Sequence, residues 1–123
     1  MGFEIRVDAA AGIVEIVYPA RPTDSDIEAY VREIKAVMDR QPKGWRCLVD
    51  QRQLAVMPPD LVERVGELNA YGAKRGMARA ARVIATSVAN LQTARMARQA
   101  SLEVPIKTFT SRDAAMAWLK GEG

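Results

Sequence analysis

Apolar and polar residues alternate one by one at the beginning of the chain. Residues 3–8 read FEIRVD, so Phe3, Ile5 and Val7 share one side, and this period of two predicts a half-buried β-strand. Residues 13–19, IVEIVYP, form a second predicted strand that a proline stops. Only the turn AAAG separates the two runs, and strands joined by so short a turn are expected to pair as an antiparallel hairpin.

After the hairpin, the apolar residues recur at the spacing of a helix. Thr23 is expected to cap a helix that ends at residues 41–44, QPKG. Its buried stripe comprises Ile27, Val31, Ile34 and Met38. The apolar run 45–49 then predicts a strand covered on both faces. A second helix is expected to open at Pro58 and Pro59, since the first helical turn requires no amide hydrogen. Its inner face comprises Leu61, Val65, Leu68 and Gly72.

The last third of the chain repeats a strand followed by a helix. Residues 78–86, ARAARVIAT, predict a strand, and Ser87 is expected to cap a helix through Ala100. The strand IKTFT follows, and Ser111 caps a final helix. The residues expected to pack inward from this helix are Ala114, Ala115, Trp118 and Leu119. The order β-β-α-β-α-β-α-β-α predicts a single α/β domain over residues 1–123, with one mixed sheet and helices laid against it.

Composition narrows the range of functions. Of the 123 residues, 49% are hydrophobic and 27% charged, which is typical of a globular protein. The chain contains no histidine, which excludes His-based acid–base catalysis, Ser-His and Cys-His nucleophile pairs and ordinary zinc sites. We therefore expect that the protein is not an enzyme and binds no metal or cofactor, although catalysis by carboxylates or lysine remains open. The single cysteine, Cys47, lies in the apolar run WRCLV and is expected to be a buried thiol. The start of the chain has a strand pattern in place of a basic and apolar leader, so we expect a cytoplasmic protein without a membrane span.

Positive charge is concentrated in one part of the chain. The net charge is only +3, yet no acidic residue lies between Glu67 and Glu103. The basic residues inside that interval are Lys74, Arg75, Arg79, Arg82, Arg95 and Arg98. The segment YGAKRGMAR is explained by a glycine-capped helix end, because a phosphate-binding loop precedes a helix instead of ending one.

One predicted helix in this interval carries a candidate basic face. Gln92, Arg95 and Arg98 share one side of the helix expected after Ser87. This face can hold phosphates or an acidic protein surface, or can simply be solvated with arginine stems over apolar surface. Binding of nucleic acid is not expected, because no aromatic residue is interleaved for base stacking.

The loop after the central strand is the candidate binding site. Residues 48–60 read LVDQRQLAVMPPD, and ligands of open α/β domains commonly bind at the carboxyl ends of strands. The candidate partner- or ligand-binding residues are Asp50, Arg52, Val56, Met57 and Asp60. A structural explanation is also available: Asp50 can pair with Arg52 or accept backbone amides at a turn. The apolar run VMPP is either an exposed contact patch, the mouth of a pocket, or a plug in the core.

Four segments together resemble a known family. They are GIVEIVYPARPT, GWRCLVDQRQL, PPDLVERVGELNAYG and TFTSRDAAMAWL, and they span most of the chain. With the predicted order of elements, the chain resembles STAS domains, the fold of bacterial anti-sigma-factor antagonists, and more narrowly the SpoIIAA-like group. The fold of that group is also likened to lipid-exchange CRAL-TRIO domains.

The resemblance implies a phosphorylation switch that this chain cannot operate. In STAS antagonists, a serine or threonine at the start of the helix after the central strand is phosphorylated to release a protein partner. Asp50 matches the acidic residue that ends the strand, but residues 26–85 contain neither serine nor threonine. Phosphorylation acts by adding nearly two negative charges, and Asp60 would supply only part of that charge.

These patterns lead to two alternative functions. The first is a non-catalytic STAS-like regulatory or protein-interaction module that binds an unknown protein partner and self-associates, as a dimer. The second is a small-molecule or lipid-binding module with an apolar pocket at the loop end of the sheet.

Overall fold

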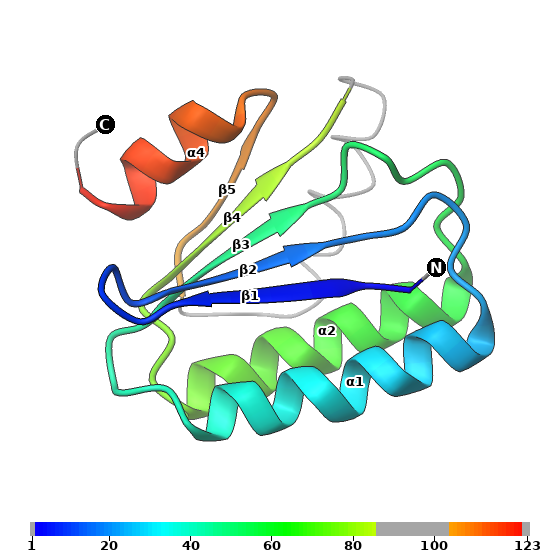
Figure 1. The fold of residues 1–123 in the computed structure, drawn as a ribbon, viewed down its shortest axis with the longest axis horizontal. Coiled ribbons are helices and arrows are strands. Elements are labelled where there is room, and N and C mark those ends of the chain that lie inside the picture. The colour runs from blue at the N-terminus through cyan, green and yellow to red at the C-terminus, as the bar shows by residue number, and fades with distance from the viewer. Residues whose placement is uncertain (1, 86–103, 122–123) are drawn as a thin grey trace.

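A mixed five-stranded sheet organises the protein (Figure 1). The computed structural model describes residues 2–85 and 104–121. The strands are β1 (Glu4–Asp8), β2 (Ile13–Val17), β3 (Arg46–Asp50), β4 (Arg79–Val83) and β5 (Ile106–Phe109), side by side in that order. β1 and β2 pair antiparallel and all other neighbours are parallel, which confirms the predicted opening hairpin and mixed sheet.

Helices cover both faces of this sheet. α1 (Asp24–Asp39) and α2 (Pro59–Lys74) lie side by side on one face, and α4 (Arg112–Leu119) lies on the other (Figure 1). The predicted caps are present: Thr23 forms a capping box with Asp26, and the Ser111 hydroxyl accepts from the Ala114 amide. The helix predicted after Ser87, with its candidate basic face of Gln92, Arg95 and Arg98, lies outside the described residues.

The larger core lies between the sheet and the α1–α2 layer. All eight residues predicted for the inner faces of these two helices are buried, and Tyr30 joins them. Cys47 is buried in the same core, as predicted, and burial raises the pKa of its thiol to about 12. Val7 differs from its prediction, because it is 47% exposed on the edge strand β1.

The smaller core lies under α4 and corrects one prediction. Ala115 and Leu119 are buried against Ile13, Leu48, Ala81 and Val83. Ala114 is exposed, whereas Trp118, although only half-buried, packs against this core together with Met116. Positions 112, 115, 116 and 119 share one side of the helix, because they are spaced by three and four residues, and this side faces the sheet.

A glycine ends α2 in the way the sequence predicts. Gly76 has a φ of +90°. The Met77 amide donates to the Gly72 carbonyl at 3.0 Å, and the Gly76 amide donates to the Ala73 carbonyl at 3.2 Å. These two bonds form a Schellman motif, which satisfies carbonyls that the helix end would otherwise leave unpaired.

Alanine substitutions at a glycine inside α2 and at the glycine that follows the helix should have opposite effects. A Cβ on Gly76 would lie 3.0 Å from the Cα of Lys43, and the backbone is left-handed, so Gly76→Ala should lower the free energy of unfolding by about 1–2 kcal/mol. Gly66 is inside α2, and an added Cβ would meet no atom within 4 Å apart from its chain neighbours and the backbone of its own helix, so Gly66→Ala should raise the free energy of unfolding by about 0.5–1 kcal/mol. Urea unfolding of both variants measures the difference. If both substitutions change the free energy of unfolding in the same direction, the backbone assignments of Gly66 and Gly76 are wrong.

Candidate interaction surface at the loop end of the sheet

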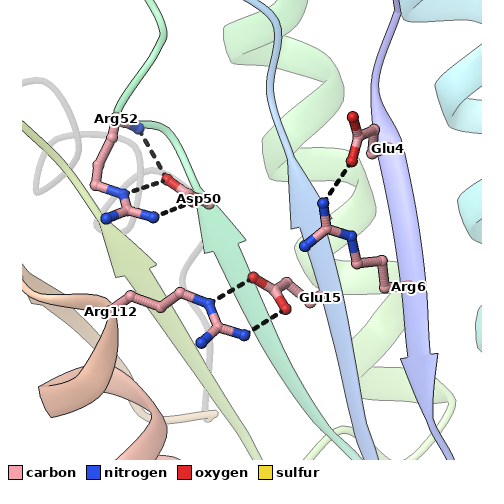
Figure 2. A network of polar contacts seen from close by, with 6 residues as sticks. All are labelled: Glu4, Arg6, Glu15, Asp50, Arg52 and Arg112. Atoms are coloured by element: carbon pink, nitrogen blue, oxygen red, sulfur yellow. Dashed lines mark hydrogen bonds and ion pairs between the residues drawn. The ribbon is translucent and has the colours of Figure 1, made fainter.

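Asp50 and Arg52 form a fixed pair where β3 ends. Asp50 is 6% exposed. Its Oδ1 accepts from the Arg52 backbone amide at 3.1 Å and from Nε at 2.9 Å, and its Oδ2 accepts from Nη2 at 2.8 Å (Figure 2). The guanidinium of Arg52 holds the pKa of Asp50 below its ordinary value, against the opposing effect of burial. The structure thus shows both contacts that the structural explanation gave for Asp50: the ion pair with Arg52 and the hydrogen bond from a backbone amide.

Backbone hydrogen bonds tie the rest of the loop to β4 and to the segment that follows β2. The Gln51 amide donates to the Val83 carbonyl at 2.8 Å, and the amides of Ala55 and Val56 both donate to the Ala20 carbonyl. Ordered hydrogen bonds of this kind hold a loop in one conformation without a regular element. The connection between β3 and α2 is therefore a defined surface of the fold.

The apolar side chains of this loop divide between core and solvent. Leu54 and Met57 are half-buried and pack against the larger core, whereas Val56 is 47% exposed. Pro58 is the residue before α2, and Asp60 is exposed in the first helical turn. In the described part of the chain, Asp60 forms no ion pair, so the structure brings together Asp50 and Arg52 but leaves Asp60 apart from them.

A second buried carboxylate lies beside this pair and was not predicted. Glu15 is 8% exposed in β2, and its two oxygens accept from Nε and Nη2 of Arg112, both at 2.8 Å. Arg112 holds the pKa of Glu15 below its ordinary value. The sequence does contain a signal for this pair: Glu15 is the lone charged residue inside the apolar strand β2, and a buried charge requires a partner.

These pairs belong to one row of alternating charge. Arg6 donates to Glu4 at 2.7 Å on the adjacent edge strand. The row comprises Glu4, Arg6, Glu15, Arg112, Asp50 and Arg52, so three carboxylates offset three guanidinium groups (Figure 2). It runs from the edge strand β1 across β2 to the first turn of α4 and the end of β3 (Figure 2).

Two arginines from the strands fix α4 over the other half of this face. Arg46 donates to the Leu119 carbonyl at 2.6 Å, and Arg79 donates to the Trp118 carbonyl at 2.7 Å. Cations are favourable at a helix C-terminus, where the last carbonyls lack partners within the helix. The anchored helix positions Arg112, in its first turn, over Glu15.

One groove lies at the loop end and one small cavity lies inside the larger core. A groove of about 380 Å³ is lined by Gly2, Glu4, Val17, Tyr18, Pro19, Ala20, Arg21 and Gln53, a mixture of polar and apolar residues. An internal cavity of about 20 Å³ lies among core residues including Tyr18, Tyr30 and Arg82. The groove reaches the roughly 300–1,000 Å³ of pockets for drug-sized ligands, but its lining includes the charged residues Glu4 and Arg21, and the internal cavity is far too small for such a ligand.

Residues 2–85 and 104–121 contain neither a metal-binding cluster nor a membrane-spanning helix. This part of the chain contains no group of three or more potential metal-binding side chains. None of its helices has the length and apolarity needed to cross a membrane.

Comparison with known proteins places the chain in a family. No curated protein sequence matches it. An uncharacterised protein from Shewanella loihica with a SpoIIAA-like fold superimposes with a TM-score of 0.75 at 16% identity, over 96% of this chain and 94% of the other. An anti-sigma-factor antagonist (STAS) domain protein from Planctomyces limnophilus gives a TM-score of 0.62 at 18% identity, over 95% and 97%. These two likenesses confirm the predicted fold. The family model described as SpoIIAA-like matches residues 13–120, and the chain therefore belongs to the SpoIIAA-like family.

Proposed function

We propose that the protein is a non-catalytic regulatory module that binds a protein partner through the loop between β3 and α2. The observation that carries this proposal is the exposed side chain of Val56 on a loop whose backbone is fixed at both ends. An apolar side chain held outward by an ordered backbone costs little entropy when a partner covers it. The family resemblance supports the same surface, because STAS antagonists are regulated at the start of the helix that follows this loop.

We further propose that this interaction is not switched by phosphorylation at α2. The loop and helix start contain no serine or threonine, and Asp60 supplies a permanent single negative charge there. Control of binding would then depend on the abundance of the partner, or on a site elsewhere in the chain.

The buried carboxylates support a binding role in place of catalysis. Glu15 and Asp50 are each held by an arginine, and their pKa values are lowered. A general acid or base working near neutral pH requires a pKa moved toward neutrality. Both groups are thus better suited to fixing the arginines than to transferring protons.

Two valines of equal exposure allow a matched test of the loop. Val56 and Val7 are both 47% exposed, but Val7 lies on the edge strand β1. Proteins that co-purify with the wild type should be identified by mass spectrometry and then titrated in purified form. We expect Val56→Asp to weaken the purified partner's binding at least tenfold, and Val7→Asp to leave it within twofold, because burying a carboxylate in an apolar contact is unfavourable. Equal affinity for both variants would reject the loop as the contact.

Native mass spectrometry separates this function from the alternative of a small-molecule or lipid module. The alternative retains one supporting observation, the groove beside Gln53. For an interaction module that self-associates, we expect twice the chain mass with no additional mass. Additional mass that is lost on denaturation would favour a bound ligand instead.

A further inference from the structure

Arg52 and Arg112 are each held by a buried carboxylate and still have unused N–H hydrogen-bond donors. Arg52 binds Asp50 through Nε and Nη2, and Arg112 binds Glu15 through the same two atoms. Within residues 2–85 and 104–121, Nη1 of neither arginine makes a hydrogen bond. The two side chains are 44% and 37% exposed, so the unused edge of each guanidinium is accessible to solvent.

Both arginines are ordered before any partner arrives. A flexible arginine loses conformational entropy when it is fixed in a contact, and this loss weakens binding. Here the buried carboxylates, at 6% and 8% exposure for Asp50 and Glu15, already fix the two guanidinium groups. Recognition of an anion by such prearranged groups avoids most of that loss.

The two guanidinium groups also lie on the same face, from separate elements. Arg52 follows β3 and Arg112 opens α4; Figure 2 shows Arg52 beside the end of β3 and Arg112 reaching to Glu15 on β2. The hydrogen bonds and charge of Asp50 raise the pKa of Arg52, and the charge of Arg112 opposes this rise. Neither arginine lines the groove beside Gln53 or the internal cavity.

We propose that Arg52 and Arg112 form a two-arginine clamp for an acidic segment of the protein partner, with one carboxylate at the free edge of each guanidinium. The clamp rests on the proposed function, because it specifies the chemistry of the partner. The planar guanidinium edge matches the two oxygens of a carboxylate. An extended segment suits this position because the two guanidinium groups come from separate elements (Figure 2) and line neither the groove nor the internal cavity, whereas small ligands require enclosure.

Conservative substitutions test the clamp at constant net charge. The probe is an octaglutamate peptide, titrated at low salt while the side-chain ¹⁵N signals of the arginines are followed by NMR. We expect shifts at the Nε signals of Arg52 and Arg112, and about tenfold weaker binding for Arg52→Lys and for Arg112→Lys, since lysine cannot offer a second planar edge. The control is Arg64→Lys, because Arg64 is also paired with carboxylates, of Glu28 and Glu67, but on α2 at the other face. Its affinity should match that of the wild type.

Two results would overturn the clamp. Equal affinity of all three lysine variants would show that octaglutamate is attracted only by the overall positive charge. Inorganic phosphate that shifts both arginine signals, with no effect of octaglutamate, would assign the pair to a phosphorylated ligand instead. Failure of the clamp is distinguishable from failure of the loop, because Val56→Asp leaves both arginines intact. If Val56→Asp loses partner binding and the wild type does not bind octaglutamate, the loop is supported as the contact and the clamp is rejected.

Discussion

Replacing Trp45 by alanine is expected to lower the free energy of unfolding by about 3–5 kcal/mol. Trp45 is 1% exposed and packs in the larger core immediately before β3. Its indole Nε1 donates to the Arg75 carbonyl at 3.2 Å, at the end of α2. The substitution therefore creates a cavity and also removes a hydrogen bond that joins the start of the central strand to a helix end.

The second tryptophan provides the matched comparison. Trp118 is half-buried, with its ring 5.8 Å from that of Phe109 and 5.1 Å from the guanidinium of Arg79. Because water already reaches this ring, Trp118→Ala should cost clearly less, about 1–2 kcal/mol. Urea unfolding followed by far-ultraviolet circular dichroism measures both variants. A loss for Trp118→Ala as large as that for Trp45→Ala would show that α4 is packed more deeply than the structure indicates.

Local patterns in the sequence were sufficient to predict the α1–α2 side of the fold. The stripe that begins at Ile27 and the stripe that begins at Leu61 recur at helical spacing, and each is buried over its whole length. The pair of Asp50 and Arg52 was also within reach, because its members are two positions apart and a turn brings them together. Such features depend on spacing along the chain and need no knowledge of the tertiary structure.

The other face of the sheet depends on contacts between distant parts of the chain. Glu15 and Arg112 are 97 positions apart, and Arg46 reaches the Leu119 carbonyl across 73 positions. These contacts fix the rotation of α4, and a helix of eight residues has too few positions for periodicity to fix that rotation by itself. The inward prediction for Ala114 was wrong for this reason, and the row of alternating charge exists only because the fold brings distant strands and α4 together (Figure 2).

Replacing Arg112 by methionine is expected to lower the free energy of unfolding by about 2 kcal/mol at pH 7. The substitution keeps an apolar stem over the sheet but leaves Glu15, 8% exposed, without its guanidinium. Removal of one partner from a fully buried ion pair costs about 3–5 kcal/mol, and the cost here is smaller because Arg112 is 37% exposed and screened by water. The double variant Arg112→Met with Glu15→Leu should recover most of the loss, since both partners are then apolar.

The pH dependence of that loss gives the sharper test, because the pKa of Glu15 shifts in opposite directions in the wild type and in Arg112→Met. In the wild type, Arg112 lowers the pKa of Glu15, so this carboxylate stabilises the fold above its ordinary unfolded pKa, and the stabilisation is lost as the pH falls through the lowered value. In Arg112→Met, burial is the main remaining influence and raises that pKa, so the fold is destabilised as the pH rises above the unfolded value. The difference between the two proteins should therefore be largest at neutral pH and shrink below about pH 4. Urea unfolding at a series of pH values measures it. A difference that stays constant from neutral to acidic pH would mean that the loss comes from packing of the Arg112 stem and not from the charge of Glu15.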